Sequence, residues 1–400
     1  MMDRRSLILG GAALSSSTAL KAFALAEPTV DLPFANGDRP LVAYPGKRPL
    51  IRLTSRPPQL ETPFHVFDEG PLTPNDAFFV RYHLADIPLS IDPDTYRLSV
   101  GGKVERPQSI SLQELKSAFE PVEIVAVAQC SGNSRGFFDP RVGGGQLANG
   151  AMGNARWRGV PLKALLEKAG MQAGARQVTF NGLDQPVSPQ TPDFVKALDI
   201  DHARDGEVMV AYEMNGQELP WLNGYPVRLI VPGYYATYWV KHLSEIRVVD
   251  EVWDGFWMKT AYRIADNDCA CTEPGQAVRS SVPIKRLNVR SFMTNLSHGA
   301  RIKAHTETLV RGIAFDGGYG IAAVLFSSDG GRSWMETKLG KDLGRYSFRE
   351  WTIPVRLEKG EHELKVCAIN RIGQTQPLSS LWNPQGYMRN SVESARVIAQ

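Results

Sequence analysis

Short apolar runs separated by polar, glycine- and proline-containing segments dominate the chain between residues 78 and 250. The runs are rich in β-branched or aromatic side chains and have the length of strands. The predicted strands are YRLSV (96–100), EIVAVAQ (123–129), QVTFNG (177–182), EVMVAYEM (207–214) and VRLIVPG (227–233). This part of the chain is therefore expected to be built mainly from short strands.

Two helices are predicted between these strands. In SLQELKSAF, Ser111 precedes Glu114 by three residues, which is the spacing of a capping box. PLKALLEKAG opens with Pro161 and ends at Gly170, the usual asymmetry of a short helix. Strands and helices do not alternate regularly, and neither G-x-G-x-x-G nor G-x-x-x-x-G-K-S/T occurs. The pattern predicts an α+β domain and disfavours a nicotinamide or nucleotide cofactor held in the usual way.

The pattern changes after residue 270. CTEPGQAVRSSVP (271–283) is interpreted as a linker, and the proline-rich residues up to about Pro74 are expected to be irregular and to wrap the first domain. Beyond the linker, alternating runs are separated by turn signals, and Asp316-Gly317-Gly318 and Asp329-Gly330-Gly331 are predicted to be hairpin turns. The predicted fold class is α+β, a mixed α/β domain followed by an immunoglobulin-like antiparallel β-sandwich.

The first 26 residues have the features of an export signal. Arg4 and Arg5 are followed by a moderately apolar stretch and by the A-x-A site at 24–26, so the mature chain is expected to begin at Glu27. The arginine pair followed by Ser6-Leu7 is typical of the twin-arginine pathway, which exports folded proteins; an ordinary secretory signal is the alternative. No other apolar run is long enough to span a bilayer. We expect a soluble periplasmic protein that acquires a cofactor before export.

Composition and charge narrow the class further. A chain of 400 residues exceeds one ordinary core, so two domains are expected. Hydrophobic residues make up 43% and charged residues 22%, as in soluble globular proteins. The net charge of +3 gives no argument for nucleic acid or an anionic membrane as a partner.

The chain has four cysteines, Cys130, Cys269, Cys271 and Cys367. Cys269 and Cys271 are too close in sequence to bridge easily, so they are interpreted as structural, or one of them as paired elsewhere. Cys367 lies in the alternating run HELKVCAIN and is expected to be a buried strand residue.

Cys130 lies where the strand EIVAVAQ gives way to the loop SGNSRG, a common place for a ligand site. Arg135 follows closely and favours the thiolate, the form that binds metal or attacks a substrate. The loop has no histidine and no second cysteine, which disfavours a zinc site or an iron–sulfur cluster. Three readings stay open: a buried small hydrophobe, a nucleophile, or a single ligand to a metal whose other ligands come from a cofactor.

Two further segments carry cations. DAFFVRYHL (76–84) places Arg81 and His83 on one face if it is extended. NGYPVRLIVPGYYATYWVKHL (223–243) is aromatic and carries Arg228 and Lys241, which suits a bound phosphate and a flat heterocycle. The alternatives are surface charges for Arg81, Arg228 and Lys241, and a hydrogen-bonded core histidine for His83.

Together these segments resemble the sulfite oxidase family of molybdenum enzymes. The matching motifs are FFVRYH, the CSGNSRG loop, FNGLD, AYEMNGQELPWLNGYPVRLIVPGYYATYWVK, RGIAFDGGYGIAAVLFSSDGGRSW and WNPQGY, in order along nearly all of the mature chain. Among the members, the sequence most resembles bacterial periplasmic sulfite dehydrogenases. The resemblance implies an export signal at 1–26, a molybdopterin-binding catalytic domain at 27–272, a linker at 273–283 and an immunoglobulin-like dimerisation domain at 284–400.

The resemblance also implies a cofactor, molybdenum held by the dithiolene sulfurs of one molybdopterin. Cys130 would be the only protein ligand to the metal, and a soft thiolate suits a metal that already has sulfur ligands. Asp184 would hold the edge of the pterin, and Asn223 stands where animal members carry a histidine. The implied cofactor-binding residues are Phe79, Val80, Arg81, Tyr82, His83, Asp184, Asn223, Arg228, Trp239, Val240 and Lys241.

The substrate implied by the resemblance is sulfite, a small oxyanion that needs convergent cations. Arg81 and Arg135 supply planar, charged donors. Tyr262 matches the active-site tyrosine of the family, whose phenol can donate a hydrogen bond and steer a proton. Trp157 is expected to wall the pocket, with a core tryptophan as the alternative. Gln385 replaces the arginine of the W-N-x-R-G motif of animal members, which removes a charge from the pocket.

The implied reaction is oxidation of sulfite to sulfate by oxygen-atom transfer. Because the sequence has no C-x-x-C-H haem motif, the electrons are expected to pass to another protein, a c-type cytochrome. A homodimer is expected, although a tight complex with a cytochrome subunit stays open. One alternative is a sulfane dehydrogenase subunit of a thiosulfate-oxidising complex. The alternative from another class is an exported immunoglobulin-like binding protein without a cofactor.

Overall fold

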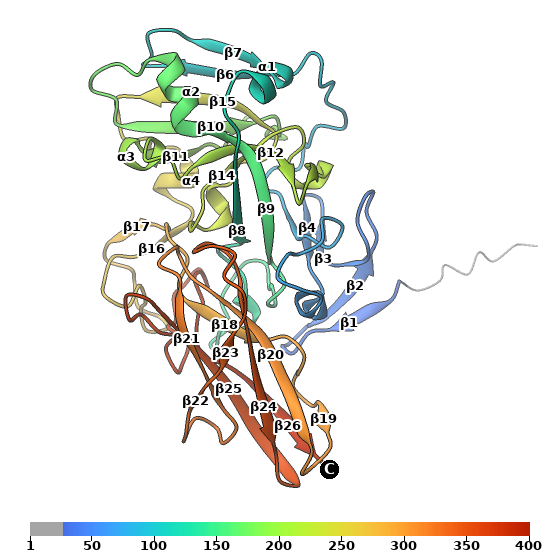
Figure 1. Ribbon diagram of the computed structural model, residues 1–400. Helices are drawn as coiled ribbons and strands as arrows, with labels where there is room; N and C mark the ends of the chain where they lie inside the picture. The colour runs from blue at the N-terminus through green and yellow to red at the C-terminus, as the bar shows by residue number, and fades with distance from the viewer. Residues whose placement is uncertain (1–26) are drawn as a thin grey trace, which may run out of the picture.

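A computed structural model describes residues 27–400, so the export signal predicted at residues 1–26 lies outside the described residues. Three regions follow one another along the chain: an N-terminal sheet, a central α+β region and a C-terminal β-sandwich (Figure 1). The structure confirms the predicted fold class. Within the described part of the chain, no helix has both the length and the apolar character needed to cross a membrane.

The N-terminal region forms a five-stranded sheet. Its strands, in spatial order, are β1 (Thr29–Asp31), β2 (Asp38–Val42), β3 (Leu50–Ser55), β4 (Pro58–Glu61) and β5 (Val80–Arg81). Leu50 and Leu60 pack with Val80 and Tyr82 in a small core. The prediction of irregular structure before Pro74 was wrong, because strands this short and proline-rich show no clear alternation. The sheet brings β5, and with it Arg81, to the edge of the central region.

Two sheets make up the central region. The first has the order β11 (Lys196–Asp199), β10 (Gln177–Gly182), β15 (Leu243–Val249), β6 (Arg97–Gly102) and β7 (Gln108–Ser111). The second has the order β13 (Gln217–Glu218), β12 (Met209–Met214), β9 (Met152–Pro161) and β8 (Val122–Gln129), and β14 (Arg228–Ile230) also pairs with β12. Every strand predicted between residues 96 and 233 is present.

The helices are short and lie over the sheets. In α1 (Leu112–Ser117), the Ser111 hydroxyl accepts from the Glu114 N–H, and the Glu114 carboxylate accepts from the Ser111 N–H, which confirms the capping box. In α2 (Leu162–Ala169), Pro161 precedes the first turn and Gly170 ends the helix at φ +70°, as predicted. The remaining helices are α3 (Ile200–Ala203), α4 (Phe256–Lys259) and the 3-10 helices at Phe64–Asp68, Arg135–Phe137, Trp221–Asn223 and Ala236–Tyr238.

The C-terminal region is a sandwich of two sheets. One sheet has the order β18 (Arg290–Met293), β20 (Glu307–Phe315), β24 (Arg349–Arg356) and β23 (Lys338–Leu339). The other has the order β19 (Arg301–Ile302), β26 (Glu393–Ala399), β25 (Gly360–Asn370), β21 (Ile321–Ser327) and β22 (Met335–Glu336). Val310 and Trp351 of the first sheet pack in one core with Val324, Val366 and Val397 of the second.

Hydrophobic packing continues from the central region into the sandwich. The largest core cluster joins Phe67 and Phe78 to Phe292, Phe315 and Phe348 of the sandwich. In Figure 1, β8 and β9 run from the top of the molecule down to the sandwich. The boundary between the regions is therefore a packed core, and a site placed there is held from both sides.

Two turn predictions had different outcomes. Asp329-Gly330-Gly331 joins β21 to β22, which pair antiparallel, so this hairpin is confirmed. Asp316-Gly317-Gly318 joins β20 to β21, which belong to different sheets, so this hairpin prediction was wrong. The buried Asp316 carboxylate accepts from the N–H of Gly318 and Gly320 and from the Asn370 amide, and these bonds hold the crossing between sheets. The turn motif specifies a tight local bend without specifying the partner strand.

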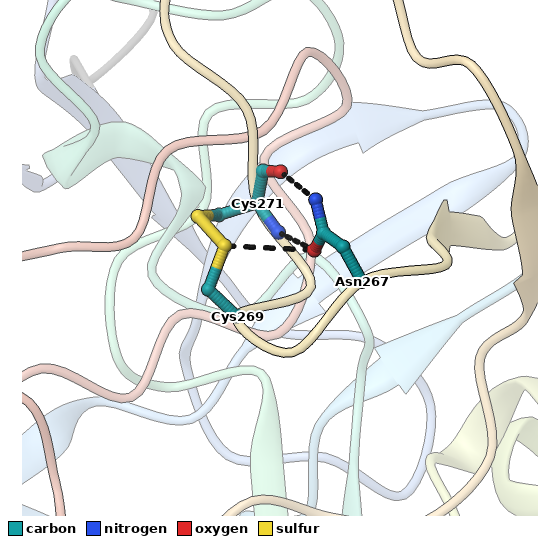
Figure 2. Close-up of a disulfide and its surroundings, with 3 residues drawn as sticks. All are labelled: Asn267, Cys269 and Cys271. Carbon is teal, nitrogen blue, oxygen red and sulfur yellow. Dashed lines mark hydrogen bonds between the residues drawn. A yellow bond between two sulfur atoms is a disulfide. The ribbon is translucent and has the colours of Figure 1, made fainter.

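The segment at the end of the central region also departs from expectation. Cys269 and Cys271 form a disulfide with Cα atoms 5.1 Å apart (Figure 2), so the interpretation that they do not bridge each other was wrong. Ala270 adopts a left-handed conformation, and Asn267 hydrogen-bonds both the N–H and the carbonyl of Cys271, which folds the chain back on itself. Cys367 is free and buried in β25, as predicted.

The predicted linker is partly structured at its end. Residues Ser281–Pro283, at its end, form β17, which pairs antiparallel with β16 (Arg263–Ala265). The connection between the two domains is therefore partly anchored to the central region.

Candidate active site

A cavity lies beside the strand ends of the central region. The predicted residues that line it come from three parts of the chain. The segment around β5 supplies Phe79, Arg81, Tyr82 and His83. The segment 223–241 supplies Asn223, Arg228, Trp239 and Lys241, and separate loops supply Cys130, Asp184 and Tyr262. Eleven of the residues singled out from the sequence thus meet around one space.

Four predicted residues do not line this cavity. Val80 and Val240 are buried and point into the protein, as expected for neighbours of lining residues in extended chain. Trp157 is fully buried on β9, where its indole N–H donates to the Ala126 carbonyl at 3.1 Å. Its ring packs edge-on against Trp239, so it supports a wall of the cavity from behind, and the expectation that it lines the pocket was wrong. Arg135, the fourth, is described below.

The cavity also has lining residues that the sequence did not single out. They are Ser131, Phe194, Ala236 and Thr237. Ser131 follows Cys130 directly and Thr237 lies within the aromatic segment, so a wider window around each motif would have included them. Phe194 is in a proline-rich connection and gave no signal.

Cys130 begins a tightly held loop at the end of β8. Its thiol is free, and the residue is 9% exposed, at the cavity wall. The Cys130 N–H donates to the Ala151 carbonyl, and its carbonyl accepts from the Asn133 N–H at 3.0 Å. Ser134 has φ +70°, which turns the chain back, and the Asn133 side chain accepts from the Ala151 N–H. The loop fixes the position of the sulfur before any ligand binds.

Arg135 lies on the outer side of this loop. Its Nε donates to the Gln385 carbonyl at 2.9 Å, and its guanidinium carbon is 5.0 Å from the centre of the Tyr387 ring. Both partners belong to the sandwich region. Arg135 is therefore next to the cavity, and its orientation depends on the other domain.

His83 and Tyr262 form a neutral pair inside the cavity. His83 Nε2 is 2.5 Å from the Tyr262 phenol oxygen, and the imidazole stacks on Phe194 at 3.7 Å. Burial, followed by the positive charge of Arg81, holds the pKa of His83 well below its usual value, so the ring is neutral. Burial raises the pKa of Tyr262, so the phenol keeps its proton. This hydrogen bond therefore joins two uncharged groups.

Cations gather around Asn223 at the cavity: the buried Lys47 and Arg228 and the half-buried Lys241. These three residues and Asn223 are here called the cation side. Lys47 Nζ donates to Asn223 Oδ1 at 2.5 Å, and the Asn223 amide donates to the Phe79 carbonyl. Arg228 donates to the Asn223 carbonyl, and Lys241 donates to the Arg81 carbonyl. Within residues 27–400, none of these three cations has a carboxylate within salt-bridge distance. Lys47 was not predicted.

Burial lowers the pKa values of the cations on the cation side. It lowers the pKa of Lys47 to about 7 and that of Arg228 to about 10, and it holds the pKa of Lys241 well below its usual value. Burial also raises the pKa of Asp184 to about 6, although Lys241 acts against this. Buried charges without partners are costly, so the arrangement is suited to an anion placed among them.

The donor set of the cavity has three chemical parts. The free Cys130 thiol suits a soft metal, and the cation side suits a phosphate. Arg228 Nε, Ser131 Oγ and Thr237 Oγ1 are buried without a hydrogen-bond partner at residues that line the cavity, which suits a polar ring system. These features fit a phosphorylated organic cofactor that carries a metal.

Comparison with known proteins agrees with this chemistry. The model of the oxidoreductase molybdopterin binding domain matches residues 84–257, and that of the Mo-co oxidoreductase dimerisation domain matches residues 281–398. Sulfite oxidase of Gallus gallus is 33% identical over 365 residues, covering 87% of this chain and 78% of that protein. Mitochondrial sulfite oxidase of Homo sapiens is 32% identical over 383 residues, covering 91% and 68%.

A solved structure shares the whole fold. The sulfane dehydrogenase SoxCD from Paracoccus pantotrophus aligns with a TM-score of 0.71 at 21% identity, covering 98% of this chain and 96% of that chain. The family model and the relatives imply a molybdenum–molybdopterin cofactor, and the residues of the cavity fit it. The chain therefore belongs to the sulfite oxidase family of molybdopterin oxidoreductases.

Proposed function

We propose that the protein oxidises sulfite to sulfate at a molybdenum–molybdopterin centre and passes the electrons to a c-type cytochrome. The observation that carries the proposal is a single free thiol, Cys130, in a cavity that also holds Arg81 and the neutral His83–Tyr262 pair. The two sulfite oxidases compared above support the choice of sulfite.

The lining of the cavity supports a role for its residues toward each part of the cofactor. Cys130 would bind the metal, and Arg228 and Lys241 would hold the phosphate. Asp184 and Asn223 would hold polar edges of the pterin. When bound, the cofactor supplies oxygen-atom transfer and accepts two electrons.

The side chains around the thiol perform the remaining tasks. Arg81 lines the cavity and presents a charged, planar set of donors to an oxyanion. The Tyr262 phenol keeps a proton at its oxygen, and the neutral His83 Nε2 lies 2.5 Å from that oxygen and orients the phenol. Transfer of the proton to the imidazole is disfavoured, because it would create a buried phenolate–imidazolium pair. The pair can donate a hydrogen bond to an oxygen beside Cys130 and return to its starting state after product leaves.

The electron acceptor, the compartment and the assembly complete the proposal. The chain has no C-x-x-C-H motif, which supports an external haem protein as acceptor. The arginine pair near the N-terminus supports export by the twin-arginine pathway to the periplasm. The match of residues 281–398 to a dimerisation domain supports a homodimer.

A second candidate is the sulfane dehydrogenase activity. The observation that favours it is the shared fold with SoxCD over 98% of this chain. Such an enzyme would oxidise a sulfane sulfur, the kind of sulfur that thiosulfate carries, and not sulfite. The cations around the cavity suit either anion, and the two sulfite oxidases compared above favour sulfite.

One experiment decides between these activities. Purified protein from a host that makes molybdopterin is analysed for molybdenum and pterin, and cytochrome c reduction is followed with sulfite and, in parallel, with thiosulfate. We expect about one molybdenum per chain and reduction that depends on sulfite. Protein loaded with molybdenum that ignores sulfite would contradict the proposal, and protein without molybdenum would remove the cofactor assignment.

A further inference from the structure

The segment Asn383–Met388 of the sandwich region lies directly on the Cys130 loop. The Gln385 carbonyl accepts from Arg135 Nε at 2.9 Å, and the Met388 N–H donates to the Ser131 carbonyl at 2.9 Å. The Asn383 side chain closes the segment on itself through the N–H and the carbonyl of Tyr387. The segment is therefore fixed at both ends against the loop that carries the thiol.

Gly386 shows how close this contact is. It has φ +58°, and a side chain there would meet Val142 and the stem of Arg135. Tyr387, the next residue, stacks on Tyr262, which lines the cavity. The mutual hydrogen bonds with Asn383 then hold its backbone.

Tyr387 lies between two residues of the site. Its ring stacks on Tyr262 with centroids 5.4 Å apart and planes at 24°, and the Arg135 guanidinium carbon is 5.0 Å from its centroid. A guanidinium is attracted to the face of an aromatic ring, and two stacked rings restrict each other's rotation. Tyr262 is also the partner of His83. The Tyr387 ring therefore contacts both the charged Arg135 and the phenol ring of Tyr262.

Gln385 contributes only its backbone carbonyl to the orientation of Arg135. Its side chain is exposed and uncharged, so its contribution to Arg135 is a backbone carbonyl. Arg135 has no carboxylate partner among residues 27–400, and its other side-chain bond goes to the Gly145 carbonyl. The direction of the guanidinium is thus set by two carbonyls and one aromatic face.

We propose that Tyr387 is a positioning residue for oxyanion binding: its ring holds Arg135 and Tyr262 in the orientation that receives the anion. The inference rests on the proposed function, since it takes a small dianion as the ligand. Tyr387 acts through its aromatic face and not through its hydroxyl. Its effect should therefore fall on the affinity for the anion more than on the turnover of bound substrate.

The test compares Tyr387→Leu, which removes the ring, with Tyr387→Phe, which keeps it, in the molybdenum-loaded enzyme. We expect Tyr387→Leu to raise KM for sulfite about five- to thirty-fold, with kcat changed less than about threefold. Tyr387→Phe should stay within about twofold of wild type in both. The dissociation constant for sulfate, a dianion that is not turned over, should rise by the same factor in Tyr387→Leu.

A double variant shows whether Tyr387 acts through Arg135. In an Arg135→Gln background, Tyr387→Leu should add little further loss of sulfate affinity, because the guanidinium that it orients is gone. Additive losses would overturn the proposal, as would an unchanged KM and sulfate affinity in Tyr387→Leu. If Tyr387→Leu and Tyr387→Met both lose the metal while Tyr387→Phe keeps it, the ring supports the fold and the proposal also fails.

The outcome is separable from the proposed function. Wild-type enzyme that does not oxidise sulfite would refute that function, and the sulfate titrations would still report on Tyr387. Wild-type enzyme that oxidises sulfite, with no effect of Tyr387→Leu, would refute only the positioning role.

Discussion

The two sides of the cavity are built differently. The cation side is held within the N-terminal sheet and the central region, by bonds such as Lys47 to Asn223 and Lys241 to the Arg81 carbonyl. The other side, here called the thiol side, comprises the Cys130 loop, Arg135 and Tyr262, and residues of the sandwich hold it. The cation side can therefore anchor a charged cofactor without help from the sandwich, whereas the thiol side needs both domains in place.

Arg290 is the most buried of the contacts that cross between the domains on the thiol side. Its side chain is fully buried, and Nη2 donates to the Ser134 hydroxyl at 3.0 Å and to Glu393 at 2.7 Å. Arg389 donates to the same Glu393 oxygen. Ser134 is the residue with positive φ that turns the Cys130 loop, so the sandwich fixes the loop at its bend. A domain whose family model is named for dimerisation thus also shapes the catalytic centre.

The largest effect is expected from the thiol itself. Cys130→Ser removes the one soft protein ligand of the cavity, so sulfite-dependent cytochrome c reduction should fall to background while the circular dichroism spectrum stays unchanged. Cys367→Ser is the matched control, because Cys367 is also free and buried but lies in β25 of the sandwich. Turnover retained in Cys130→Ser, or lost equally in both variants, would show that the thiol side is not where the metal binds.

The next effect tests whether the sandwich holds the thiol side. Arg290→Met breaks a buried ion pair and removes the donor to the Ser134 hydroxyl, which keeps only its bond to Asn149. The free energy of unfolding should therefore fall by about 3–5 kcal/mol. Urea denaturation measures this loss, and sulfite turnover should fall with it at temperatures where the variant is folded.

Arg311→Met provides the control for this variant. Arg311 also crosses between the domains, to Asp68, but its side chain is 47% exposed. Its loss should therefore cost less than about 1 kcal/mol. Equal losses in the free energy of unfolding would mean that the buried Arg290 contacts at the Cys130 loop stabilise the protein no more than an exposed ion pair does.

The same comparison explains what could be predicted from the sequence. Asn223, Arg228 and Lys241 lie in one short segment, so a local motif carries most of the cation side. Lys47 was missed because it is separated from Asn223 by 176 residues, and no local pattern marks a lysine whose partners are backbone carbonyls. Cys130 was found because a strand visibly ends there.

Contacts across the domain boundary left almost no signal in the sequence. Arg290 and Tyr387 look like ordinary residues of a β-sandwich, and their roles depend on packing between distant segments. Trp157 shows the opposite error. The family resemblance suggested that it walls the pocket, yet it is fully buried and packs behind Trp239. The N-terminal sheet was missed because its strands are short and proline-rich, and because β5 is separated from β4 by an irregular segment that contains the 3-10 helix Phe64–Asp68.

A third prediction uses Lys196, a buried lysine that lies near Tyr262 of the thiol side. Lys196 Nζ donates to the Trp257 carbonyl at 2.6 Å and lies 5.5 Å from the Tyr262 ring centroid; burial, followed by the charge of Arg263, lowers its pKa to about 7. Between pH 7 and 10.5 the unfolded chain binds this proton and the folded chain does not, so wild-type stability rises with pH across that window. Below pH 7 the folded protein keeps a buried charge at full cost.

Lys196→Met should therefore stabilise the protein by about 2–4 kcal/mol at pH 6, and the gain should shrink toward zero near pH 10. Urea denaturation at the two pH values measures it. Lys259→Met, which removes an exposed lysine paired with Asp254, should change stability by less than about 0.5 kcal/mol at either pH. A destabilised Lys196→Met at pH 6 would show that the ammonium has a compensating partner.

The smallest expected effect separates binding on the two sides of the cavity. Arg81 lines the cavity next to the thiol side, while its backbone carbonyl accepts from Lys241 of the cation side. Arg81→Gln keeps that carbonyl and removes only the charge, so KM for sulfite should rise by about one to two orders of magnitude, equivalent to about 1.5–3 kcal/mol. Molybdenum and pterin content should stay at the wild-type level, because the cation side is intact.

Arg97→Gln is the matched control, since Arg97 is exposed on β6 and donates only to nearby backbone carbonyls. It should leave KM unchanged. If Arg81→Gln instead lost pterin with no change in the KM of the loaded fraction, the Arg81 charge would belong to cofactor binding. Arg81 would then belong to the cation side, which anchors the cofactor, and not to the part of the cavity that binds sulfite.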